Sequence, residues 1–226
     1  MRKSFPVVGQ FSQSAARRYD NQDTVNMYID DMNEESSVHS ITLNPFPGYE
    51  EFLEIPEATG TPRINGIFSY LTNTYVAFGT NVFKVDQNNI IEKLSPATLF
   101  SITTPLSWAN SSTQIAVADG VALYVYDIPT NNFTQITLPT GIPSNPFVVY
   151  YQDARLFIRF ENDPRVYFSA QGDFTQLSSN NFEIQESRPS IATGLTGVNE
   201  RLFLLGDVST EVWFPPTSNT ANPIIR

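Results

Sequence analysis

The sequence contains no cysteine and only one histidine among its 226 residues. The lack of cysteine excludes disulfide bonds, thiol catalysis and thiolate metal sites. A single histidine, His39, cannot build a multi-histidine metal site within one chain. No Gly-x-Ser-x-Gly nucleophile motif occurs, and the acidic run at 30–35 lacks the alternating ligands and the glycine of an EF-hand. We therefore expect no enzymatic activity, no cofactor and no metal.

Long apolar runs are also missing. The longest run of large apolar side chains is Phe147 to Tyr151, far short of the roughly 18 residues that cross a bilayer, so we expect no membrane span. The apolar stretch after the first residues ends too early for a signal peptide. Charged residues make up only 16% of the chain and aromatic residues 13%, a mixture that favours strands over helices.

Basic residues are few, with 13 Lys plus Arg against 23 Asp plus Glu, and the net charge is −10. Tight binding to DNA depends on cations that displace counterions from phosphates, so the charge favours protein partners. Residues 1–62 concentrate this acidity: ten acids and no Lys or Arg lie between Asp20 and Glu57. With a short predicted strand at 24–29 and a Pro/Gly turn at 44–49, this segment is predicted to be an extended acidic arm.

Residues 63–226 contain an internal repeat. Residues 74–86 align without gaps with 115–127 at an offset of 41, which matches Gly79 with Gly120 and Asp86 with Asp127. Each window predicts a hairpin with a tight glycine turn, and a further strand is predicted on either side. Hairpins recur at spacings of 41, 40 and 46 residues, which predicts four units, near 63–94, 104–138, 146–177 and 190–226. The last unit stops before its fourth strand.

Four-stranded units at this spacing are typical of β-propeller blades, so the predicted fold class is all-β and propeller-like, possibly incomplete at the C-terminus. The alternative is an all-β sandwich, whose strands also recur every 8 to 12 residues.

Two groups of side chains suggest glycan chemistry. Asp86 and Asp127 could flank a sugar as a carboxylate pair, but a residue that recurs in each unit more often serves the blade turn. Sialidase-type propellers hold a substrate carboxylate with clustered arginines, and the second half of the chain carries five: Arg155, Arg159, Arg165, Arg188 and Arg201. The Ser-x-Asp-x-Gly-x-Thr-Trp turns of such proteins are absent.

Several short motifs, in this order, resemble the tail hub or packaged-DNA stabilisation (nozzle) proteins of short-tailed bacteriophages. They are Arg18-Tyr19-Asp20, Val25-Asn26-Met27-Tyr28, Phe46-Pro47-Gly48-Tyr49, Asp153-Ala154-Arg155-Leu156-Phe157-Ile158, and a final Thr210-Glu211-Val212-Trp213-Phe214. In that family a Val-Asn-Met strand and a Pro-Gly turn precede a β-propeller. Family members are about twice as long, so the remaining blades and any tip domain have no counterpart in this sequence.

The resemblance implies a structural virion protein in the phage tail, assembled in the host cytoplasm. It implies a homo-hexameric ring beneath the portal and the head-to-tail adaptor, in contact with tail fibre or needle proteins, which retains packaged DNA and conducts it during ejection. An acidic lumen would let DNA slide, because it repels phosphates. The expected channel-lining residues are Asp30, Asp31, Glu34 and Glu35. The expected assembly contacts are Arg17, Arg18, Tyr19, Val25, Asn26, Met27 and Tyr28. The alternative function is a carbohydrate-binding or glycoside-cleaving propeller for host-surface recognition.

Overall fold

The computed structural model describes residues 27–32, 40–45, 55, 63–100, 104–185 and 192–214. The chain divides into two compact units, Met1–Glu54 and Ile55–Arg226. In the first unit, β1 (Met27–Met32) pairs antiparallel with β2 (Ser40–Pro45), with Met27 opposite Pro45. β1 overlaps the strand predicted at 24–29. No strand was predicted at the position of β2, whose last two residues, Asn44 and Pro45, fall within the stretch predicted as a Pro/Gly turn.

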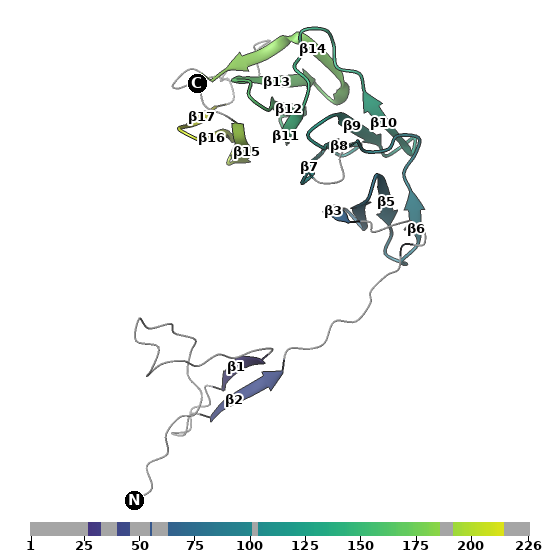
Figure 1. The fold of residues 1–226 in the computed structure, drawn as a ribbon, viewed down its shortest axis with the longest axis vertical. Coiled ribbons are helices and arrows are strands. Elements are labelled where there is room, and N and C mark those ends of the chain that lie inside the picture. The colour runs from purple at the N-terminus through teal and green to yellow at the C-terminus, as the bar shows by residue number, and fades with distance from the viewer. Residues whose placement is uncertain are drawn as a thin grey trace, which may run out of the picture. The chain divides into compact units, whose positions relative to one another are not determined.

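The second unit is built from antiparallel sheets in which each strand pairs with the next along the chain (Figure 1). We call these sheets blades 1 to 4. Blade 1 consists of β3 (Ile64–Tyr70), β4 (Asn73–Phe78), β5 (Asn81–Val85) and β6 (Ile91–Lys93). Blade 2 consists of β7 (Ser107–Asn110), β8 (Gln114–Ala118), β9 (Leu123–Asp127) and β10 (Asn132–Ile136).

Blade 3 consists of β11 (Pro146–Gln152), β12 (Arg155–Phe160), β13 (Arg165–Ala170) and β14 (Asp173–Ile184). Blade 4 has three strands within the described residues: β15 (Ala192–Val198), β16 (Arg201–Gly206) and β17 (Thr210–Trp213). The all-β fold and the four-stranded units predicted from the repeat are confirmed.

Two of the hairpin turns use glycine, which readily adopts a left-handed backbone. Gly79 has φ 59° and Gly120 has φ 83°, which explains why the aligned windows share a glycine. The turns between β11 and β12 and between β15 and β16 instead place Asp153-Ala154 and Asn199-Glu200 at positive φ.

The apolar core is divided into three layers, each between successive blades. One joins blades 1 and 2 around Tyr75 and Tyr124, the next joins blades 2 and 3 around Leu123 and Ile158, and the last joins blades 3 and 4 around Phe157. A strand in such a stack is covered on both faces, so the middle strands β8 and β9 are almost entirely buried. The fold is therefore a series of sheets in which each sheet packs on the next along the chain.

Candidate functional site

The residues expected to line a channel or make assembly contacts lie in the first unit. The structure places Met27, Tyr28, Asp30 and Asp31 in β1, where Asp30 is opposite Thr42 and Asp31 opposite Ile41. The other expected residues lie outside the described residues: Arg17, Arg18, Tyr19, Val25, Asn26, Glu34 and Glu35. β1 therefore holds two of the expected channel acids and two of the expected assembly residues in one short strand.

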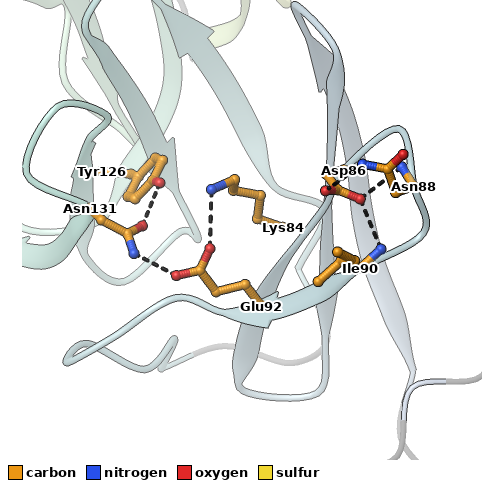
Figure 2. Close-up of polar contacts among 7 residues, drawn as sticks. All are labelled: Lys84, Asp86, Asn88, Ile90, Glu92, Tyr126 and Asn131. Atoms are coloured by element: carbon orange, nitrogen blue, oxygen red, sulfur yellow. Dashed lines mark hydrogen bonds and ion pairs between the residues drawn. The ribbon is translucent and has the colours of Figure 1, made fainter.

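A polar cluster connects blades 1 and 2 (Figure 2). Glu92 accepts a hydrogen bond from the Lys84 ammonium at 3.1 Å, and its other oxygen accepts one from the Asn131 amide. Asn131 Oδ1 in turn accepts a hydrogen bond from the Tyr126 hydroxyl, with an oxygen–oxygen distance of 2.7 Å. Because Lys84 and Glu92 belong to blade 1, and Tyr126 and Asn131 to blade 2, the chain of contacts fastens the two blades together.

Electrostatics in this cluster favour the ionised carboxylate. The hydrogen bonds from Asn131 and then Lys84 hold the pKa of Glu92 below its usual value. Burial raises the pKa of Tyr126, and the nearby carboxylates of Glu92 and Asp127 raise it further. The arrangement leaves Glu92 charged and Tyr126 neutral at pH 7, as expected for a hydrogen-bond network that connects two blades.

The repeated aspartates serve turns. Asp86 Oδ1 accepts the backbone N–H groups of Asn88 and Ile90, both at 2.8 Å, and these bonds lower the pKa of Asp86 (Figure 2). Asp127 Oδ1 accepts the N–H and the hydroxyl of Thr130. The turn role predicted from their equivalence is confirmed, because each carboxylate caps the loop that follows its strand.

The arginines of the second half do not converge on one point. Arg155 donates to Ser169 O at 2.8 Å, Arg165 forms an ion pair with Asp163, and Arg201 lies 5.2 Å above the Phe214 ring. Burial alone would raise the pKa of Asp163, but the hydrogen bonds from Arg165 outweigh it and lower that pKa. Arg188 lies outside the described residues. Each described arginine thus has its own separate structural contact.

Arg159 is fully buried between blades 3 and 4, which the sequence did not indicate. It donates to Leu205 O at 2.8 Å and to Gln185 Oε1 at 2.9 Å, while its Nε has no partner among the described residues. Burial lowers the pKa of Arg159, partly opposed by the charge of Glu211. The only sequence signal for this role is its place in Leu156-Phe157-Ile158-Arg159-Phe160, a run otherwise made of apolar residues.

Asp119 is a buried acidic residue of blade 2. Its carboxylate accepts the N–H groups of Val121 and Ala122 in its own turn, together with the N–H of Phe100 and the hydroxyl of Tyr124. Burial raises the pKa of Tyr124, and the charge of Asp119 raises it further. Asp119 therefore anchors the segment that enters blade 2 from blade 1.

Within the described ranges, no group of three or more acidic or histidine side chains could hold a metal ion. No helix in this part of the chain is long and apolar enough to cross a membrane.

The sequence matches no protein-family description and no curated protein. The fold is similar to solved β-propellers. The designed protein Ika4 is 10% identical with a TM-score of 0.53, over 74% of this chain and 99% of Ika4. The designed protein Ika8 is 10% identical with a TM-score of 0.51, over 85% of this chain and 57% of Ika8.

A natural propeller is equally similar. PorZ, a surface component of the type-IX secretion system of Porphyromonas gingivalis, is 15% identical with a TM-score of 0.52, over 88% of this chain. The chain spans 25% of the PorZ chain. At these identities the similarity shows the β-propeller fold alone.

Proposed function

We propose that this protein is a structural subunit of a bacteriophage tail nozzle, which assembles below the portal and adaptor, retains packaged DNA and conducts it during ejection. The observation that carries the proposal is the order of parts along the chain. A hairpin that begins with Met27-Tyr28 of the Val-Asn-Met-Tyr motif lies in a unit of its own, and β-propeller blades follow it. This is the order of parts in the nozzle proteins whose motifs the sequence resembles.

The acidic hairpin supports the DNA-conducting part of the proposal. β1 carries Asp30 and Asp31 on adjacent positions, and Glu34 and Glu35 follow within four residues. Around a ring, each further subunit would add the same acidic segment to the lumen wall. Such a wall repels phosphates, so DNA moves past it without the counterion release that would hold it.

The contacts of the described arginines weigh against the alternative of a glycan-cleaving propeller. A site that grips a sugar carboxylate needs guanidinium groups that converge on an open space. Arg155, Arg159 and Arg165 instead donate to Ser169 O, Leu205 O and Asp163. Their donors are directed to the blade scaffold.

The proposal is tested with the purified full chain by light scattering and end-on electron-microscope averages. A nozzle subunit should form a six-fold ring with an open centre, and the ring should bind the head-to-tail adaptor. Deletion of residues 1–30 should abolish adaptor binding, whereas substitutions confined to blade turns should not. Purified chain that neither forms rings nor binds the adaptor, but binds or cleaves sugars on a glycan array, would replace this proposal with the carbohydrate function.

A further inference from the structure

Blade 4 has an apolar face on the side turned away from blade 3. Leu202 and Leu204 of β16 pack into the layer shared with blade 3. Because side chains alternate across a strand, Phe203 and Leu205 lie on the opposite face. Leu205 is 36% exposed and Phe214, in the same face, is 42% exposed. This face is apolar yet partly open to solvent.

The same face of blade 3 binds a neighbouring blade. At an offset of 46 residues, four positions of the two blades correspond: Phe157 to Phe203, Arg159 to Leu205, Val166 to Val212, and Phe168 to Phe214. In blade 3 all four are at most 6% exposed, because blade 4 covers them. Even the ring contact repeats, since Arg155 lies 5.7 Å above Phe168 as Arg201 lies 5.2 Å above Phe214. Blade 4 therefore repeats the surface on which blade 3 receives its neighbour.

Blade 1 has the complementary kind of face. Ile67, Val76, Phe83 and Val85 precede, by 41 residues each, the blade 2 residues Trp108, Val117, Tyr124 and Tyr126. Those four blade 2 residues pack against blade 1. Phe83 and Val85 are already buried within the chain, so the open part of the blade 1 face lies along β3, where Ile64 is 53% and Ile67 is 61% exposed.

We propose that the face of blade 4 formed by Phe203, Leu205, Val212 and Phe214 binds the β3 face of blade 1 in a second copy of this chain, head to tail. The reason for choosing a second copy is continuity with the junctions inside the chain. Each internal layer joins the downstream face of one blade to the upstream face of the next. In one copy, Leu205 and Phe214 of the blade 4 face and the β3 part of the blade 1 face are exposed. Such a heterologous contact joins copies into a ring or a chain of copies. It uses the blades alone and does not depend on the nozzle function.

The test compares the native full chain with Leu205→Asp and Ile67→Asp, which place a carboxylate on either side of the junction. Light scattering of the native chain up to about 1 mM, a range that detects millimolar association, should give a mass above the 25.3 kDa of one chain. Each variant alone should give 25.3 kDa. Mixed together, the two variants should form pairs, because the mixture keeps one intact junction between the unsubstituted faces. Val198 lies three residues after Leu195, which packs toward blade 3, so alternation along β15 places it on the opposite face, where it is 58% exposed. Val198→Lys therefore provides a second substitution on that side.

Val121→Asp is the matched control, since Val121 is 49% exposed in the β8–β9 turn and lies on neither face. It should associate like the native chain, and circular dichroism should show that all variants are folded. A native chain that is monomeric throughout would overturn the inference. Association that survives Leu205→Asp and Val198→Lys would overturn it too, as would association that Ile67→Asp leaves unchanged, because that result indicates pairing of blade 4 with itself.

Discussion

At the scale of single residues, polar side chains form specific hydrogen bonds between neighbouring blades. Arg159 is buried against carbonyl and amide acceptors, and Glu92 links Lys84 of its own blade to Asn131 of the next. Apolar layers between sheets are tolerant of sliding, whereas hydrogen bonds with fixed geometry define one relative position. These residues therefore specify how each blade sits on its neighbour.

Replacing Arg159 by alanine should destabilise the fold. The change leaves Leu205 O and Gln185 Oε1 without this donor and opens a cavity, which together cost about 2–4 kcal/mol. Chemical denaturation of Arg159→Ala measures the loss. Arg201→Ala is the control, because Arg201 is exposed, and its removal should change the free energy of unfolding by less than about 1 kcal/mol. Equal stability of the two variants would contradict the role of Arg159.

Glu92 should make part of the stability depend on acid pH. Its pKa is lowered in the folded protein from a usual value of 4.5, so its contribution is present above pH 4.5 and is lost as the pH falls through the folded pKa. Because the Glu92 side chain is 43% exposed, solvent limits this contribution to about 1 kcal/mol or less. Native protein and Glu92→Gln should differ most in free energy of unfolding at pH 7, and the difference should shrink as the pH falls below 4.5 and through the folded pKa of Glu92.

The variant Asn131→Ala distinguishes the effect of Asn131 on the pKa of Glu92 from the effect of Lys84. Asn131 is the main source of the lowered pKa of Glu92, so its removal should shrink the pH-dependent difference, while Lys84 preserves some of it. Denaturant titrations at several pH values measure both variants. A gap between native protein and Glu92→Gln that widens toward low pH would contradict the expected loss of the Glu92 contribution in acid.

At the scale of elements, the repeat predicted most strands closely because hairpins carry local signals. The hairpin predicted at 74–86 coincides with β4 and β5, and the glycines at 79 and 120 mark two of the turns. β14 was predicted to end at Leu177 but extends to Ile184. The stretch Ser178-Ser179-Asn180-Asn181 has turn composition. It lies at a register shift, between Leu177, which pairs with Ser169 of β13, and Phe182, which pairs with Tyr167. Such tertiary pairing leaves no local signal in the sequence.

The interblade side chains were predictable only in part. The turn aspartates followed from their recurrence, but Arg159 was grouped with four other arginines as a substrate-binding set. The structure separates these arginines because a strand covered on both faces buries side chains on either face. Arg159 is the charged side chain that is buried in this way. Which blade face a charged residue meets depends on packing between blades, and a single sequence does not contain that information.

Gln114 connects β8 of blade 2 to β14 of blade 3 and should contribute to the stability of the fold. Its side chain, at the start of β8, accepts the N–H of Phe174 at 2.8 Å and donates to Asp173 at 3.4 Å, both in β14. Gln114→Ala should lower the free energy of unfolding by about 1–2 kcal/mol and speed hydrogen exchange at the Phe174 amide. Exposed Gln135 in β10 is the control, and Gln135→Ala should leave that amide protected. Unchanged exchange in Gln114→Ala would contradict the link.

At the scale of the whole molecule, the acidic balance and the propeller fold bear on the proposed conduction of DNA. A net charge of −10 opposes attraction of phosphates over the distances that salt does not screen. The described arginines do not offset this charge as an open basic patch, because Arg155, Arg159 and Arg165 donate to acceptors within the blades. The charge of the first unit is therefore the feature to alter in a test.

Reversing Asp30, Asp31, Glu34 and Glu35 to lysine should convert a chain that repels DNA into one that holds it. Each substitution adds two charges, so four move the net charge from −10 to −2. Duplex DNA binding, measured by fluorescence anisotropy between about 50 and 200 mM salt, should strengthen, and its salt slope should steepen by about 0.9 for each phosphate contacted.

A control with equal net charge replaces by lysine four exposed acids of the blades that lie apart in the sequence: Asp153, Glu161, Glu200 and Asp207. It should gain less affinity, because its new cations are not gathered in one short segment. Equal gains from the two variants would show that net charge alone governs DNA binding and would remove the special role of residues 30–35.

The stacking of each blade only on the next in sequence also bears on how the protein is made. Every layer of the core joins segments that are neighbours along the chain, and no described layer joins blade 4 back to blade 1. Repeats that contact only their neighbours can fold by growth from one end. On a ribosome, which delivers the N-terminus first, each blade can pack on its predecessor as it emerges, before the rest of the chain is synthesised.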